Sequence, residues 1–180
     1  MFTFFGDCEK HDFVIASAMA LGVITNKTPH IVTDMDKNYK YFDGEVSGVI
    51  IGYPEDTEEA VVVYDCHDIL LNDAPERLIA FTDFSKHSID RIIGLRRRMS
   101  IDALVVIEED SYLPSKYIEE FLGQDYPMFV YPYSSKRKQD CLFTGTFKFK
   151  SLDSDFVKCL EKFFLQYSNI TKKDLKSVWN

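Results

Sequence analysis

The stretch FTFFGDCEKHDFVIASAMALG, residues 2–22, contains an apolar run, a polar segment after Gly6 and a second, longer apolar run. The first run, residues 2–5, has the length of a strand. The second, residues 13–21, is apolar nearly all round, as in a helix buried under a sheet, and Asp12 is placed to serve its N-terminus. A strand, a short loop and a buried helix bind a nucleotide phosphate in many proteins. The stretch therefore raises the question of whether this loop binds one.

The rest of the chain continues the alternation of strand-like and helix-like segments. Apolar runs rich in Val, Ile and Phe are short enough for strands buried on both faces. Besides the first run, we expect strands at residues 30–33, 48–51, 60–64, 78–81, 103–107 and 128–131. Further helices are expected at residues 87–99, 114–124 and 153–168, and the polar residues 134–140 are expected to form a surface loop. This order predicts a three-layer α/β/α fold with a mostly parallel sheet of about six to seven strands, in a single domain over residues 1–180.

Composition narrows the function classes. The chain is 46% apolar with a net charge of −8, which favours a folded protein and argues against one that coats nucleic acid by charge. Its four cysteines include no CxxC pair, as expected of reduced thiols. The N-terminus has no basic region and no cleavage site, and no apolar stretch reaches the roughly 18 residues of a membrane span. We therefore expect a complete, cytoplasmic chain.

Polar and acidic residues follow several of the expected strands. HIVTDMDKN, residues 30–38, carries Asp34 and Asp36, and EEAVVVYDCHD, residues 58–68, carries Asp65. With the first stretch, with residues 77–98 and with PMFVYPYSSKRK, residues 127–138, this order resembles the ParA/MinD branch of the P-loop ATPases along most of the chain. The resemblance implies a P-loop NTPase-like fold, a nucleotide pocket in which Asp65 positions the magnesium shell, and dimerisation across the pocket face.

The phosphate-binding loop is where the chain departs from that family. The family pattern is K-G-G-x-G-K-T-[ST], in which glycines turn backbone N–H groups toward the phosphates and a lysine neutralises their charge. Counted back from the helix, His11 stands at the place of the lysine and Lys10 at the place of a glycine. Asp12 and Phe13 stand at the two hydroxyl positions, and Gly6 is the one glycine present.

The charge of this loop also opposes phosphate binding. Asp7, Glu9 and Asp12 bring negative charge toward the place of a triphosphate, and each unpaired like-charge contact costs on the order of 1–4 kcal/mol. We therefore expect no nucleotide hydrolysis, no catalytic residue and no cofactor, with ATP and magnesium as the alternative. The residues interpreted as a former nucleotide pocket are Gly6, Asp7, Cys8, Lys10, His11, Asp12, Asp36 and Asp65.

Two other chemistries use the same loops. Cys8, His11, Cys66 and His67 would approach one another if their strands are adjacent, and zinc takes such ligands in tetrahedral geometry. Neighbouring residues of an extended strand point to opposite faces, so Cys66 and His67 do not easily converge. A thiolate nucleophile needs positive surroundings, whereas these loops are acidic. We therefore predict no metal site and no thiol chemistry.

Two surface features are candidates for contacts with other molecules. A basic patch on the expected helix at residues 87–99 comprises Arg91, Arg96, Arg97 and Arg98. It is interpreted as a solvated helix face, with an acidic protein, an anionic membrane surface or a DNA backbone as alternatives. The aromatic runs at residues 129–133 and 143–150 are expected mainly to cover the sheet, with an exposed contact surface as the alternative.

These observations favour a non-hydrolysing ParA/MinD-like protein that acts through protein–protein contacts as a positioning, assembly or regulatory factor. Altered members of that family are associated with secretion, pilus, conjugation or partition machinery. We expect a protein partner, with a homodimer as one form, no nucleic acid and at most peripheral membrane contact. The alternatives are a divergent ATP-binding switch that uses Lys10, Asp36 and Asp65, and a metal-binding regulatory protein.

Overall fold

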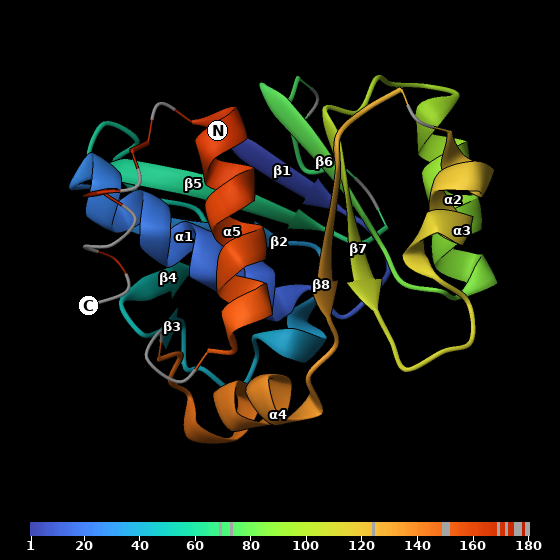
Figure 1. Ribbon diagram of the computed structural model, residues 1–180. Coiled ribbons are helices and arrows are strands. Elements are labelled where there is room, and N and C mark those ends of the chain that lie inside the picture. The colour runs from blue at the N-terminus through green and yellow to red at the C-terminus, as the bar shows by residue number, and fades with distance from the viewer. Residues whose placement is uncertain are drawn as a thin grey trace.

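The computed structural model describes residues 1–68, 70–72, 74–123, 125–148, 152–168, 170–171, 173–174 and 178, without the side chains of Asp36 and Asp140. Within these residues the chain forms one α/β unit around a sheet (Figure 1). The strands are β1 (Phe2–Phe5), β2 (Thr28–Thr33), β3 (Glu45–Val46), β4 (Val49–Ile51), β5 (Ala60–Cys66), β6 (Arg77–Thr82), β7 (Ala103–Glu108) and β8 (Met128–Pro132). The helices are α1 (His11–Thr25), the 3-10 turn η1 (Asp36–Asn38), α2 (Lys86–Arg96), α3 (Ser115–Leu122), α4 (Ser135–Thr144) and α5 (Ser154–Tyr167).

The sheet is mostly parallel, as predicted, but larger than predicted. Its strand order is β3-β4-β2-β5-β1-β6-β7-β8, and within the described chain β3 and β4 form the antiparallel pair. All seven expected strands are present, with boundaries within two residues of those expected. The additional strand, β3, has two residues, and within the described part of the chain it pairs with β4 alone, across a tight turn. A pairing this short leaves no periodic pattern in the sequence.

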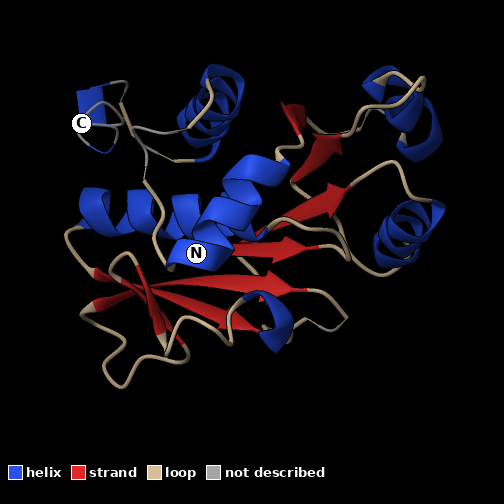
Figure 2. Cartoon of the chain, turned by 90° about the horizontal axis from the view of Figure 1, so that it is seen from below, coloured by secondary structure: helices blue, strands red, loops and turns tan. Residues whose placement is uncertain are grey.

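Side chains that alternate along the central strands separate into two apolar cores. Phe4 and Phe81 point into the core under α1 and α5, where the rings of Phe13 and Phe163 pack against them. Phe5 and its neighbours on β6 and β7 point into the other core, which α2 and α3 cover. Figure 2 shows the strands between these two sets of helices. Because both faces are covered, the strands are apolar on both faces, as the sequence indicates.

Helix α1 is buried along most of its length, which explains its nearly uniform apolar sequence. It begins at His11, so the residue that precedes its first turn is Lys10 and not Asp12. Asp12 lies inside the first turn, where its carboxylate accepts a hydrogen bond from the backbone N–H of Phe13 at 2.9 Å. Asp12 therefore lies at the helix N-terminus, as expected, but inside the first turn and not as its cap, because the helix starts two residues earlier than expected.

The predicted surface loop at residues 134–140 is wrong, because this segment begins α4. The hydroxyl of Ser134 caps the helix by accepting from the backbone N–H of Arg137, and Gly145 ends it in the left-handed conformation. Figure 1 shows α4 beyond the arrowheads of β7 and β8, at the carboxyl edge of the sheet. Helix α2 also ends earlier than expected, at Arg96. None of the described helices has both the length and the apolar character needed to cross a membrane.

Candidate functional site

The predicted former pocket lies where the loop between β1 and α1 meets the end of β5. These two strands are neighbours, and the register pairs Phe4 with Asp65 and Phe5 with Cys66. Gly6 fits this place because a side chain there would come within 2.2 Å of the backbone oxygen of Phe81. Close packing of the loop against β6 therefore requires glycine, independently of any phosphate.

Lys10 and Asp65 form a buried ion pair at the centre of the site. The Lys10 Nζ atom lies 2.7 Å from Asp65 Oδ1 and donates to the Gly6 carbonyl at 2.6 Å, and both side chains are fully buried. Tyr39 donates to the other oxygen of Asp65 at 2.6 Å. Burial by itself raises the pKa of Asp65, but the Lys10 ammonium and the neighbouring His67 outweigh it and hold the pKa well below its usual range. Asp65 is therefore a carboxylate whose charge is already matched within the protein.

Asp12 is the second buried carboxylate, and its partners come from α4. Its oxygens lie 2.7 Å from Arg137 Nε and 3.0 Å from Lys138 Nζ. Burial by itself raises the pKa of Asp12. The charges of Lys138 and Arg137 together outweigh this effect, so the pKa is lowered to about 2. All three side chains are almost completely withdrawn from water. The first turn of α1, where a helix attracts anions, is therefore occupied by the chain's own carboxylate.

The two cations of α4 are fixed by further contacts. Lys138 also donates to the backbone oxygen of Glu9, and Arg137 donates to the backbone oxygen of Pro132 at 3.0 Å. Arg137 makes a second ion pair, with Asp153. Together the two cations join the β1–α1 loop, through Lys138, to the end of β8 and the residue before α5, through Arg137. Sequence reasoning missed Arg137 and Lys138 as site residues. The sequence did carry a sign of the helix that presents them: Ser134 as an N-cap, helix-forming residues after it, and Gly145 at its end.

The remaining acidic residues of the loops hold backbone and side chains in place. Asp7 pairs with the His87 ring at 2.8 Å, and its backbone oxygen accepts from Ser88 at the start of α2. Asp34 accepts from the backbone N–H groups of His67 and Asp68, at 2.7 Å each. Asp36 belongs to η1, and its side chain lies outside the described residues. Asp34 therefore anchors the segment after β5.

The thiols and imidazoles of the site are buried. Burial raises the pKa of Cys8 and of Cys66 to about 12, so both stay as thiols at neutral pH. Burial also lowers the pKa of His11, and neither ring nitrogen of His11 has a hydrogen-bond partner among the described residues. No group of three or more His, Cys, Asp or Glu side chains in the described chain is placed to hold a metal ion. The neutral thiols leave no nucleophile of the kind that the Cys–His hypothesis needs.

Comparison of the chain with protein-family models, curated proteins and solved structures finds no match. The functional argument therefore rests on the geometry of the site. At the carboxyl edge of the sheet that geometry gives two buried carboxylates, each neutralised by side chains of the same chain.

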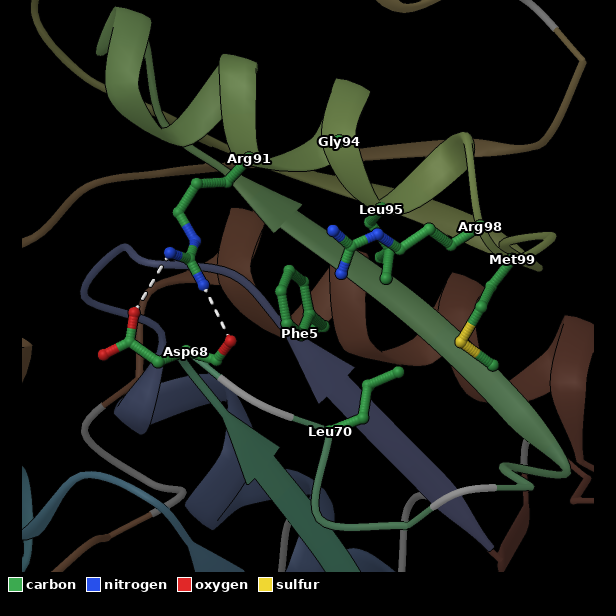
Figure 3. Close-up of a pocket in the computed structure, with 8 residues that line it drawn as sticks. All are labelled: Phe5, Asp68, Leu70, Arg91, Gly94, Leu95, Arg98 and Met99. Carbon is green, nitrogen blue, oxygen red and sulfur yellow. Dashed lines mark hydrogen bonds and ion pairs between the residues drawn. The ribbon is translucent and has the colours of Figure 1, made fainter.

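The structure divides the predicted basic patch into two pairs of residues. Arg91 contacts Asp68 at 3.0 Å, and Arg96 contacts Asp125 at 3.2 Å while lying over the Tyr126 ring. Arg97 and Arg98 follow at the end of α2 and are exposed. Arg91 and Arg96 are therefore paired with carboxylates, whereas Arg97 and Arg98 form no ion pair with any residue that the structure describes. Arg98 also lines a cavity (Figure 3).

The aromatic runs are mostly buried, as expected. Phe129, Tyr131 and Phe147 pack in the core, whereas Tyr133 and Phe143 are exposed. The last residues of the second run, 149 and 150, lie outside the described residues. These runs therefore form no continuous contact surface among the residues that the structure describes.

Proposed function

We propose that this chain is a non-hydrolysing protein of three-layer, P-loop NTPase-like and specifically ParA/MinD-like architecture, which acts through protein–protein contacts in the cytoplasm. Its role would be that of a positioning, assembly or regulatory factor, for example in secretion, pilus, conjugation or partition machinery. The strand order supports the architecture, because β5, which ends near Asp65, lies beside β1 and its loop. Parallel strands of this kind present their loops at one edge of the sheet.

The observation that carries the proposal is the pairing of Asp12 with Arg137 and Lys138. A phosphate at the first turn of α1 would compete with this carboxylate for the same two cations. Removing one partner from a buried ion pair costs about 3–5 kcal/mol, which corresponds to a loss of more than 100-fold in affinity. Nucleotide binding in the usual geometry would have to supply that free energy first. The arrangement favours a structural centre over a nucleotide site.

An exposed apolar surface supports the protein-contact part of the proposal. Tyr117 and Phe121 lie one turn apart on α3, with ring centroids 4.9 Å from each other, and are 40% and 56% exposed. Tyr112 and Leu113, just before this helix, are exposed as well. We call these four residues the α3 patch. Aromatic groups of this kind are enriched at protein interfaces, and clustered exposure of this type marks interaction sites.

Affinity capture with the tagged chain tests this proposal in extracts of the native cell. We expect a specific protein to be captured by the unaltered chain and lost with the double variant Tyr117→Glu, Phe121→Glu. The matched control is Phe143→Glu, which introduces the same group at an exposed aromatic residue of α4, away from the α3 patch. This control should retain the partner.

Sedimentation velocity of the purified chain separates self-association from a different partner. A dimer that dissociates with the α3 double variant would identify a second copy as the partner. Capture that is unaffected by the α3 variant would contradict the patch as the contact surface. Capture of no protein by any form would contradict the proposed mode of action.

A further inference from the structure

A cavity of about 510 Å³ lies between α2 and the segment after β5, apart from the charged centre described above. Its apolar lining comes from Phe5, Leu70, Leu95 and Met99, and two arginines of the α2 region stand at its sides (Figure 3). Its volume is within the range of small-molecule sites, which are mostly apolar with a few polar groups that orient the ligand. The cavity therefore has the size and the surface of a ligand site.

The two arginines differ in whether their charge is already matched. Arg91 donates to the backbone oxygens of His67 and Asp68 and forms an ion pair with the Asp68 carboxylate at 3.0 Å. It also lies over the Phe5 ring, 5.6 Å from the centroid, so it is held as part of the wall. Arg98 is exposed, and its guanidinium makes no hydrogen bond or ion pair with the described residues. In Figure 3 it extends from the end of α2 across Leu95 toward the cavity.

Gly94 leaves the helix side of the cavity open. Among the described residues, a methyl group added at Gly94 would meet no atom within 4 Å outside the backbone of α2. The other helical glycine, Gly22 of α1, differs because a side chain there would come within 2.9 Å of the Pro29 ring. Glycine inside a helix costs about 0.5–1 kcal/mol relative to alanine, and at Gly94 no packing contact accounts for it. Its effect is to let a bound molecule approach the backbone of α2.

We propose that this cavity binds a small amphipathic carboxylate. The apolar body of the ligand lies on Phe5, Leu70 and Met99, and its carboxylate pairs with the Arg98 guanidinium. A guanidinium matches a carboxylate in a two-bond fork, which favours a planar monoanion. One unmatched cation suits a single negative charge and not the several charges of a nucleoside triphosphate. The inference is independent of the proposed function, because it concerns residues other than those of the charged centre and of the α3 patch.

Titration calorimetry with decanoate tests the proposal, with displacement of the fluorescent anion 8-anilinonaphthalene-1-sulfonate as a second readout. We expect one saturable site for decanoate and none for decyltrimethylammonium, which has the same chain length and the opposite charge. Arg98→Glu should weaken decanoate binding at least about tenfold, as expected for loss of a charge-assisted contact. The matched control is Arg97→Glu, which makes the same charge change at an exposed neighbour that does not line the cavity. It should change the affinity less than about twofold.

Gly94→Leu locates the site, because Gly94 lines the cavity and a Cβ atom there meets no other described element within 4 Å. It should abolish decanoate binding while the thermal unfolding temperature stays the same or rises. Absence of saturable decanoate binding, equal loss in the Arg97 and Arg98 variants, or full binding by a folded Gly94→Leu variant would each overturn the proposal. Equal binding of decyltrimethylammonium would overturn the assignment of an anion site.

Discussion

The fully buried carboxylate of Asp12 forms ion pairs with two cations of α4, Arg137 and Lys138. Arg137 lies 125 residues after Asp12 in the sequence. A buried ion pair adds little to the stability of a fold when it is compared with apolar side chains of equal volume. Removing only one of its partners, however, lowers the stability strongly. Loss of one partner is therefore expected to cost more stability than replacement of the whole cluster. Each member of the cluster is tolerated only while its partners are present.

Replacing Asp12 with Asn measures this asymmetry. Asp12→Asn keeps the shape but leaves Arg137 and Lys138 buried without a counter-charge, so the free energy of unfolding should fall by about 3–5 kcal/mol. Asp90→Asn is the control, because Asp90 is exposed on α2, and it should change stability by less than about 0.5 kcal/mol. Chemical denaturation gives both values. Equal stabilities for the two variants would contradict the buried pairing.

Acid should destabilise the fold in two stages. Burial lowers the pKa of His11 below its ordinary 6.5, so the unfolded chain takes up this proton first and stability is lost as the pH falls below about 6.5. The pKa of Asp12 is about 2 in the folded protein and 3.8 ordinarily, so about 2 kcal/mol of stability present above pH 3.8 is lost toward pH 2. The second stage should be smaller in the Asp12→Asn variant, and the part that remains comes from Asp65, whose pKa is also lowered in the folded protein. A fold that becomes more stable from pH 7 to pH 5 would show that the sign is wrong.

The cysteines should react slowly in the folded protein. All four are buried, and burial raises the pKa of Cys8, Cys66, Cys141 and Cys159 to about 12. Because the thiolate is the reactive form, an aromatic disulfide reagent should label none of them within minutes under native conditions and all of them in denaturant. Rapid labelling of a single native thiol would indicate an exposed or activated cysteine.

Among the elements, α4 decides whether the site is closed. It presents Arg137 and Lys138 toward α1, and its first turn depends on the hydroxyl of Ser134, which accepts from the Arg137 N–H at 3.2 Å. Ser134→Ala should therefore lower the free energy of unfolding by about 0.5–2 kcal/mol, as for other helix caps. Ser100→Ala, at an exposed residue outside any helix or strand, is the matched control and should have no measurable effect. Equal unfolding free energies for the two variants would contradict the cap.

In helix α2, by contrast, a substitution is expected to stabilise the fold. Gly94→Ala should raise the free energy of unfolding by about 0.5–1 kcal/mol, because alanine restricts the unfolded chain and the added methyl group meets no other element among the described residues. Thermal and chemical denaturation measure this gain. A destabilised Gly94→Ala variant would mean that the cavity wall is not open at that residue.

The elements also explain what the sequence could predict. The strands and α1 were predictable because buried apolar runs repeat with recognisable lengths. Helix α4 was not, because its buried side chains include Arg137 and Lys138, which appear in the sequence as a solvated polar run. The pocket residues Lys10, Asp12 and Asp65 were found from their positions after strands. That they are neutralised within the chain depends on contacts across the fold, which spacing along the sequence does not encode.

For the whole molecule, the strand order indicates where a ligand would bind, whereas the buried ion pairs occupy that same place. The order β2-β5-β1-β6-β7-β8 gathers the loops after the parallel strands at one edge, where α/β proteins commonly bind ligands. At that edge the chain has placed its own ion pairs. We propose that these ion pairs oppose nucleotide binding at that edge, and that the α3 patch and the α2 cavity are the surfaces for other molecules.

Titration calorimetry of the purified chain with ATP and magnesium tests the central claim most directly. The account predicts no binding tighter than about 1 mM, because the cations that a phosphate needs are paired with Asp12 and Asp65. The folded variant Asp65→Asn should give the same result. Binding of ATP in the micromolar range by the native chain, abolished by Asp65→Asn, would contradict it.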